Sequence, residues 1–211
     1  HSLWGRITVR CVNNYYYYPK ALSPRFCDDV IKYGLRHETR RALTGPGSEA
    51  SFNEKDKKQL KLLKKKRDSQ VVWMNDPWIF REIRPWLIQA NKDAGWNFQW
   101  DSSEAFQFTQ YDKGQYYGWH VDSFDPKGNE KKIRKISLTL TLSKPEKYKG
   151  GELEFCFPAV GSPKSKTKVC TEIKEQGSIV FFPSFMLHRV KPITQGRRHS
   201  LVCWHLGDPF Q

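Results

Sequence analysis

The second half of this 211-residue chain alternates between short apolar segments and turn-forming residues, and this pattern limits the possible folds more than any other feature. From Phe98 onward, segments rich in β-branched and aromatic residues are bounded by Gly, Pro, Asn, Asp or Ser. We expect eight strands, over residues 104–111, 118–123, 133–142, 151–157, 168–173, 177–183, 187–191 and 198–205. So many short strands in succession indicate an antiparallel barrel or jelly roll.

The first half of the chain predicts helices. Ser23-Pro24 and Asp76-Pro77 each combine an N-cap residue with proline at the first helical position. We expect one helix from Pro24 to about His37, and a second from Pro77 until Gly95 over which apolar residues recur at helical spacing.

The helices are expected to support the strands within one domain. A short strand is predicted at 15–18, and the lysine-rich segment near residue 60 is predicted to be helical. We therefore expect a single domain over residues 1–211, with helical support from residues 1–97 and a β core over residues 98–211.

The chain is strongly basic. Its 36 Lys and Arg against 22 Asp and Glu give a net charge of +14, and Lys55–Arg67 holds eight basic residues and one acid. Such a stripe can attract nucleic acid or an acidic protein, and it equally fits the solvated face of a helix. A second basic segment, Pro158–Lys168, could bind an acidic peptide or form a solvated hairpin tip.

Cysteine usage and hydropathy limit the class of protein. Five cysteines without a Cys-x-x-Cys pair argue against framework disulfides and structural zinc, so we expect a reducing, cytoplasmic environment. No apolar run approaches the ~18 residues that a membrane helix needs, and residues 1–6 lack the apolar core of a signal peptide. Aromatic residues make up 14% of the chain, which argues against disorder.

A possible metal site lies in the strand-rich half. His120 and Asp122 are two residues apart, and on a strand such side chains project from the same face. His188, from a later strand, offers a third ligand. Two histidines and one carboxylate are the ligand set of non-haem Fe(II) oxygenases. A hydrogen-bonded His–Asp pair on a surface strand and a structural His188 are the alternatives.

The last predicted strand carries two arginines, Arg197 and Arg198, on opposite faces. An arginine that points into a barrel would require an anion, and its planar guanidinium suits a carboxylate. Alternation does not decide which face is inward, and both arginines could be surface charges. The two faces consist of Arg198, Ser200, Val202 and Trp204, and of Arg197, His199, Leu201 and Cys203.

Three sequence blocks together resemble one family. The first runs from Tyr111 through Gly114 and Tyr117 to His120 and Asp122. The second is Leu142–Leu153 with its Gly150-Gly151 pair, and the third extends from Gly177 through His188 and Arg198 to Trp204. In order and spacing these blocks resemble the Fe(II)/2-oxoglutarate-dependent dioxygenases, in the branch of the prolyl 4-hydroxylases and PKHD-type hydroxylases. The resemblance covers about residues 104–205.

The resemblance implies a mostly β fold with supporting helices, a double-stranded β-helix of the jelly-roll or cupin type. It implies Fe(II) held by His120, Asp122 and His188, and Arg198 paired with the far carboxylate of 2-oxoglutarate, which places the Arg198 face inward. The other cosubstrate positions that it implies are Tyr111, Thr141, Leu153 and Trp204. Tyr117 and Trp119 would face the substrate.

The resemblance also implies an activity. 2-Oxoglutarate and O2 would be consumed to give succinate and CO2 while a C–H bond is hydroxylated, with ascorbate as reductant. The expected substrate is a proline-containing peptide or protein, converted to 4-hydroxyproline. Alternatives are a nucleic-acid oxidative demethylase of the same superfamily, and a non-catalytic basic module that binds nucleic acid through Lys55–Arg67.

Overall fold

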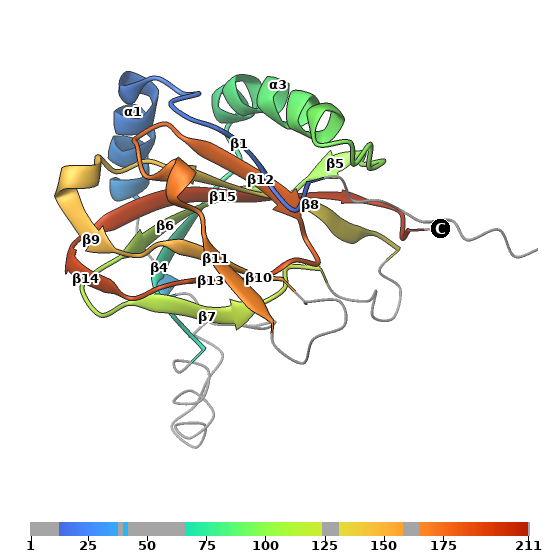
Figure 1. The fold of residues 1–211 in the computed structure, drawn as a ribbon. Helices are drawn as coiled ribbons and strands as arrows, with labels where there is room; N and C mark the ends of the chain where they lie inside the picture. Colours follow the sequence, from blue (N-terminus) through green and yellow to red (C-terminus); the bar gives the residue numbers. More distant parts are fainter. Residues whose placement is uncertain (1–12, 38–39, 42–65, 124–130, 158–164, 211) are drawn as a thin grey trace, which may run out of the picture.

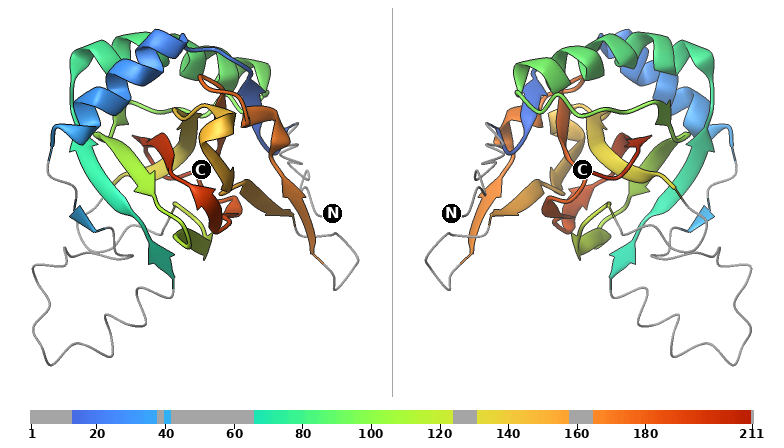
Figure 2. Two further views of the ribbon diagram at one scale, coloured as in Figure 1. Left: turned by 90° about the vertical axis from the view of Figure 1, so that its left-hand side faces the viewer. Right: turned by 90° about the vertical axis from the view of Figure 1, so that its right-hand side faces the viewer.

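The fold is two antiparallel sheets packed face to face, with two helices on the outer side of the larger sheet (Figures 1 and 2). The computed structural model of the chain describes residues 13–37, 40–41, 66–123, 131–157 and 165–210. Within these ranges the order of elements is that of a double-stranded β-helix, so the predicted jelly roll with supporting helices is confirmed.

Two sheets form the sandwich, and every strand pair in them is antiparallel. The larger sheet has the order β1 (Tyr16–Tyr18), β12 (Ile179–Pro183), β8 (Ile133–Thr141), β15 (Arg198–Gly207), β6 (Phe106–Tyr111), β4 (Gln70–Met74) and β2 (Arg40–Arg41), and β5 (Ser102–Ser103) also pairs with β15. The smaller sheet has the order β11 (Lys166–Val169), β10 (Leu153–Phe157), β13 (Leu187–Val190), β7 (Tyr116–His120) and β3 (Arg67–Asp68). A separate two-stranded ribbon joins β9 (Tyr148–Gly150) and β14 (Ile193–Gly196).

Each of the eight predicted core strands coincides with a strand of the structure, and β1 matches the strand predicted at 15–18. The largest difference is at 168–173, where β11 ends at Val169 and a short 3-10 turn, Thr171–Ile173, follows. Six further short strands were not predicted, and four of them (β2 to β5) precede Phe106. The N-terminal half therefore contributes strands as well as helical support.

Most of the segment predicted as a lysine-rich helix lies outside the described residues, and only its end can be compared with the structure. Residues 55–65 lie outside the described part of the chain, but Lys66 is in a turn and Arg67 belongs to β3. Arg67 pairs with Tyr117 in the ladder between β3 and β7. The last residue of the basic segment is therefore in a β-strand, which pairs with β7 at the edge of the smaller sheet.

The two predicted helices are present. Helix α1 (Pro24–Leu35) begins at Ser23, whose Oγ accepts a 3.1 Å hydrogen bond from the Phe26 amide, as an N-cap should, and it ends two residues before the predicted end. Helix α3 (Pro77–Asp93) follows Asp76, but that side chain does not cap the helix. Its carboxylate accepts a 2.8 Å hydrogen bond from the Tyr33 hydroxyl and so links the two helices.

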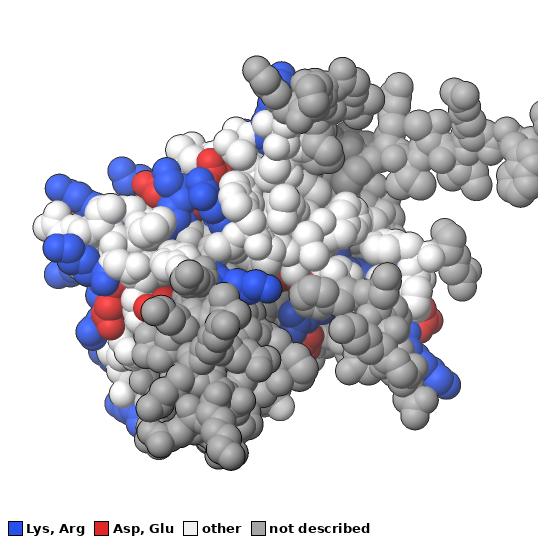
Figure 3. Space-filling view, turned by 90° about the horizontal axis from the view of Figure 1, so that it is seen from below, with Lys and Arg blue, Asp and Glu red and all other residues white. Residues whose placement is uncertain are grey.

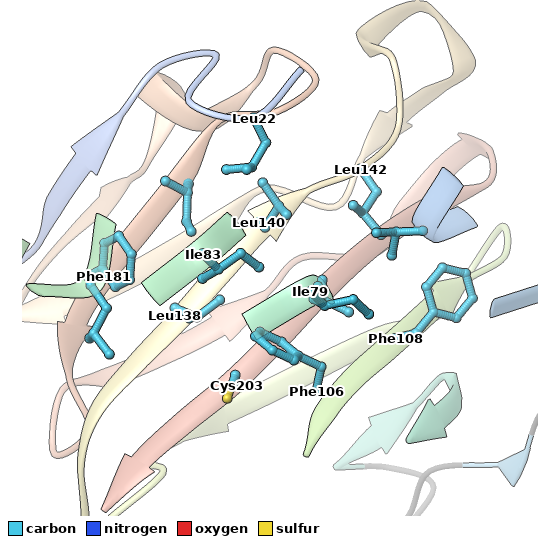
Figure 4. Close-up of a cluster of buried hydrophobic side chains, with 14 of the residues drawn as sticks. Leu22, Ile79, Ile83, Phe106, Phe108, Leu138, Leu140, Leu142, Phe181 and Cys203 are labelled. Atoms are coloured by element: carbon cyan, nitrogen blue, oxygen red, sulfur yellow. The ribbon is translucent and has the colours of Figure 1, made fainter. Parts of the chain in front are cut away.

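The main hydrophobic core lies between these helices and the larger sheet (Figure 4). Helix α3 buries Ile79 and Ile83 against a layer that includes Phe106, Leu138 and Cys203. Helix α1 approaches so closely that a Cβ on Gly34 would lie 2.7 Å from the Phe108 ring. The larger sheet is therefore braced on its outer side, which leaves its inner side for the site.

A second, smaller core fills part of the space between the two sheets. It includes Phe155 and Leu153 from β10, Val180 and Phe182 from β12, and Tyr111 from β6. These residues pack between the two sheets.

Two further expectations concern cysteines and membranes. The four cysteines within the described ranges, Cys27, Cys156, Cys170 and Cys203, are all free. Among the described residues, no helix combines the length and the apolar character that a bilayer crossing requires.

Candidate active site

The three predicted metal ligands meet between the sheets. His188 on β13 lies directly opposite His120 on β7, and Asp122 follows β7 by two residues. Their potential ligand atoms all lie within 4.8 Å of one another. Nε2 of His120 is 3.4 Å from one Asp122 carboxylate oxygen, and Nε2 of His188 is 3.6 Å from the other. One cation could therefore contact all three side chains.

Both histidines are oriented through their other ring nitrogen. Nδ1 of His120 lies 2.8 Å from the Gly118 carbonyl, and Nδ1 of His188 lies 2.8 Å from the Met186 carbonyl. A carbonyl oxygen only accepts, so each Nδ1 carries a proton, and in a neutral ring of this tautomer Nε2 has the lone pair. Burial lowers the pKa of His188 to about 4, so this ring is neutral at neutral pH. Histidine metal ligands commonly have this second hydrogen bond.

Asp122 is buried and is held by groups from the larger sheet. The Ser137 hydroxyl donates a 2.7 Å hydrogen bond to its carboxylate, and the Asp122 amide donates a 2.8 Å bond to the Ser184 carbonyl. Burial by itself raises the pKa of the carboxyl, but His188, His120 and the Ser137 hydroxyl together hold that pKa below its ordinary value. The group is therefore an anion aimed at the two Nε2 atoms.

Arg198 lies in the same pocket and is 2% exposed. It pairs with Tyr111 in the ladder between β15 and β6, and its guanidinium carbon is 5.7 Å from the centre of the Tyr111 ring. Within the described residues, its Nη1 is buried without a hydrogen-bond partner, and so is Nε1 of Trp204, which lines the same pocket. These two buried donors can bond to a ligand that supplies oxygen atoms. A dicarboxylate such as 2-oxoglutarate is such a ligand.

The inward face of β15 is the one that the resemblance implied. Arg198, Ser200, Val202 and Trp204 all line the pocket. On the other face, Leu201 and Cys203 are in the core beneath the helices, His199 stacks on Phe108, and Arg197 forms an ion pair with Asp112.

The Gly150-Gly151 pair makes room for Arg198. Both residues have positive φ, 77° and 69°, as the predicted tight turn requires. A Cβ on Gly151 would lie 3.0 Å from Cδ of Arg198 and 2.3 Å from Cδ1 of Ile193. The absence of a side chain here therefore lets the arginine lie along the turn.

Four of the remaining predicted site residues line the pocket: Tyr111, Tyr117, Leu153 and Trp204. Thr141 does not line it, because its hydroxyl donates to the Ile173 carbonyl at 2.8 Å. The neighbouring position on that face, Thr139, is the lining residue.

Trp119 lies outside the pocket. It is 39% exposed, and the Arg189 guanidinium lies 4.6 Å from its ring centre. The ladder between β7 and β13 shifts register between His120 and Tyr117, which allows both of these side chains to face inward, although they are three residues apart. Trp119 is adjacent to the inward-facing His120, so ordinary strand alternation places it on the outside.

Sequence reasoning missed several lining residues, of which Arg67 is the most unexpected. It is 6% exposed and lines the pocket, although it ends the segment predicted to be a solvated basic stripe. Ser200 and Val202 could have been assigned from their shared strand face. The others are Gln107, Thr139, Phe182 and Val190.

The surface charge of the described residues is mixed. Seen from below, Lys and Arg concentrate toward one edge with Asp and Glu among them (Figure 3). On β13 and β10, for example, Arg189 is paired with Glu154 at 2.7 Å. Most of the Lys55–Arg67 stripe, residues 55–65, lies outside the described ranges, and Arg67 faces the pocket.

Comparison with known proteins agrees with this geometry. The family model of the 2OG-Fe(II) oxygenase superfamily matches residues 106–206. PKHD-type hydroxylases from Acidovorax ebreus and Teredinibacter turnerae are 39% and 40% identical over 101 and 100 residues, which is 46% of this chain in each case. The match spans 41% of the length of either relative.

Solved structures share the fold over nearly the whole chain. The viral collagen prolyl hydroxylase from Paramecium Bursaria Chlorella virus-1 is similar with a TM-score of 0.63 and 20% identity, covering 94% of this chain and 99% of that one. A prolyl-4-hydroxylase from Pseudomonas putida is similar with a TM-score of 0.61 and 19% identity, covering 91% of both chains. The segment that matches the 2OG-Fe(II) oxygenase superfamily, residues 106–206, thus carries the convergent His-Asp-His side chains and the buried arginine.

Proposed function

We propose that this chain is an Fe(II)- and 2-oxoglutarate-dependent dioxygenase that hydroxylates a peptidyl proline to 4-hydroxyproline. The observation that supports it most strongly is the unpartnered Nη1 of Arg198, buried in the pocket that also holds His120, Asp122 and His188. When bound, ferrous iron would supply the activation of O2, with 2-oxoglutarate as the co-reductant that leaves as succinate and CO2.

The protein residues have distinct tasks in this proposal. His120, His188 and Asp122 would hold the iron with two neutral imidazoles and one carboxylate, which leaves positions open for cosubstrates. Arg198 would bind and orient the far carboxylate of 2-oxoglutarate. Leu153, Phe182 and Val202 line the pocket with apolar surface and would exclude water from the reacting atoms.

The proline substrate is supported by an aromatic wall and by the nature of the relatives. Trp204 lines the pocket and is fixed by the Arg134 guanidinium, 3.9 Å from its ring centre. Arg134 is in turn held by two hydrogen bonds to Glu104, of 2.6 and 2.7 Å. A rigid aromatic surface suits a compact apolar ring such as that of proline. A structural relative from Trichoplax adhaerens, with a TM-score of 0.60, is a prolyl hydroxylase in complex with a peptide fragment.

The other expectations remain predictions. Ascorbate as reductant and a cytoplasmic location belong to this proposal. Binding of nucleic acid through Lys55–Arg67 has no support in the described residues, because Arg67 is buried.

Incubation of the protein with ferrous iron, 2-oxoglutarate, ascorbate and proline-rich peptides tests the proposal. We expect succinate to form in proportion to peptide, and the peptide to gain the mass of one oxygen atom at a proline. Methylated oligonucleotides serve as the competing substrate. If the oligonucleotides are demethylated and the peptides are not hydroxylated, the proposed proline substrate is wrong. If succinate forms with neither substrate, the proposed dioxygenase activity is wrong.

A further inference from the structure

Arg67 is buried at the point where the chain passes from one sheet to the other. It lies on β3, at the edge of the smaller sheet, and β4 of the larger sheet begins three residues later at Gln70. Its Nε donates a 2.9 Å hydrogen bond to Ser69, and its Nη2 donates a 2.7 Å bond to Oε1 of Gln107 on β6. The guanidinium of Arg67 is therefore held in a single orientation by Ser69, which connects β3 to β4, and by Gln107 of the larger sheet.

The guanidinium is held against the Tyr117 ring. Its central carbon lies 4.5 Å from the centre of the Tyr117 ring. The same ring is stacked on His120, with centroids 3.5 Å apart and planes inclined by 10°. The imidazole, stacked 3.5 Å from the ring centre, covers one face of the phenol and leaves no room there for the guanidinium, so Arg67 lies toward the other face. Tyr117 is thus enclosed between a fixed cation and a predicted metal ligand.

This arrangement leaves His120 with two constraints. The Gly118 carbonyl holds its Nδ1, and the Tyr117 ring covers its face. A hydrogen bond to a single ring nitrogen still permits the imidazole to tilt about that contact, whereas a stacked ring prevents the tilt. The register irregularity turns the Tyr117 side chain inward, where its ring stacks on His120. The guanidinium of Arg67 packs against this ring and holds it in the stacked position.

We propose that Arg67 is a positioning residue of the metal centre: it clamps Tyr117 against His120 and so keeps Nε2 of His120 directed at the ion shared with Asp122 and His188. The inference rests on the proposed function only in taking these three residues as metal ligands. Groups that orient metal ligands typically change metal affinity by about 10–100-fold when removed.

Cobalt(II) binding to the metal-free protein tests this role without turnover. We expect Arg67→Met to weaken Co(II) binding by roughly tenfold and to change the visible absorption of the bound ion, which reports its coordination geometry. We expect Tyr117→Phe, which keeps the ring, to bind Co(II) like the wild type. Arg25→Met is the matched control, because the Arg25 side chain on α1 is 92% exposed. Circular dichroism and thermal unfolding of each metal-free variant show whether it is folded.

A double substitution separates positioning from general destabilisation. If Arg67 acts through the phenol, then Arg67→Met in a Tyr117→Ala background causes no further loss of Co(II) affinity. Equal losses in both backgrounds would overturn the inference, and so would wild-type affinity in folded Arg67→Met. A variant that changes only the KM for peptide would assign Arg67 to substrate contact and would also overturn it. Should Arg67→Met fail to fold, Gln107→Met, which removes one anchor, is expected to show a smaller loss of the same kind.

The two proposals fail separately. Wild-type protein that binds Co(II) but forms no succinate would reject the proposed activity and leave the role of Arg67 standing. Normal turnover together with unchanged Co(II) binding by Arg67→Met would reject the role of Arg67 alone.

Discussion

His120 and His188 lie directly opposite each other in the ladder between β7 and β13, with their ring centroids 4.2 Å apart. Strand pairing thus fixes the separation of two of the three proposed metal ligands before any ion binds. Asp122 is fixed separately, through Ser137 and the Ser184 carbonyl. The centre is therefore preorganised, and little conformational entropy remains to be lost when a metal enters.

Substitution of the ligands should abolish activity. We expect His120→Ala or Asp122→Ala to eliminate iron-dependent succinate release, since two remaining ligands cannot retain the ion. Asp101→Ala, at an exposed carboxylate paired with Lys132, is the control and should behave like the wild type. Succinate formation near the wild-type rate in Asp122→Ala would show that the metal centre is assigned incorrectly.

The hydrogen bond from Ser137 to Asp122 should affect metal affinity. We expect Ser137→Ala to weaken metal binding by roughly tenfold, because it removes the 2.7 Å hydrogen bond that orients the carboxylate. Titration of the metal-free protein with Co(II) measures the effect. Ser102→Ala is the matched control, because the Ser102 hydroxyl also donates to a carboxylate, that of the exposed Asp101, and equal affinities in the two variants would contradict the prediction.

The two adjacent arginines should differ in their effect on 2-oxoglutarate. We expect Arg198→Ala to raise the KM for 2-oxoglutarate by roughly 10–100-fold, since a hydrogen bond to a charged group contributes about 1.5–3 kcal/mol. Arg197→Ala breaks only the outer ion pair with Asp112 and should leave that KM unchanged. Steady-state kinetics at varied 2-oxoglutarate concentration measures both KM values. Similar values in the two variants would show that Arg198 does not bind the cosubstrate.

The absence of a side chain at Gly151, beside Arg198, should affect both 2-oxoglutarate binding and stability. We expect Gly151→Ala to raise the KM for 2-oxoglutarate and to lower the free energy of unfolding by about 1–3 kcal/mol, because the new Cβ meets Arg198 and Ile193 at positive φ. Gly114→Ala is the control, since its φ is also positive but a Cβ there meets nothing within 4 Å. It should cost about 1 kcal/mol of stability and leave the KM unchanged. Equal KM values in the two variants would count against the packing argument.

The buried His205 and the half-buried His199, both outside the metal centre, should make folding stability depend on pH. Burial lowers the pKa of His205 to about 3 and that of His199 to about 4, whereas an unfolded chain titrates near pH 6.5. Below about pH 6.5 the unfolded state therefore binds protons that the folded state does not. The free energy of unfolding should fall as the pH falls from 6.5 toward 4, by up to about 1.4 kcal/mol per pH unit for each histidine.

Urea unfolding of the metal-free protein at about pH 7.5 and pH 5 measures this dependence. His205→Gln should show a smaller loss between the two pH values than the wild type does, by about 1–2 kcal/mol. His37→Gln is the control, because His37 is exposed. An identical loss in the wild type and His205→Gln would show that His205 does not carry the effect.

Much of the site could be predicted from the sequence where local periodicity was enough. The alternation along 198–204 separated Arg198 from Arg197, and the cap signals at Ser23 and Asp76 located both helices. Even so, Asp76 binds Tyr33 instead of capping α3, because a residue distant in sequence offered its carboxylate a competing donor.

The ligand types, their order along the chain and the alternation of the strands that carry them could be predicted from the sequence, because these depend on residues a few positions apart. The three-dimensional arrangement was needed to show that Arg67 enters the pocket, that Tyr117 faces inward together with His120, and that Thr139 rather than Thr141 lines the site. Those outcomes depend on the register between strands far apart in the chain and on one irregularity in that register. The periodicity of a single strand carries no information about either.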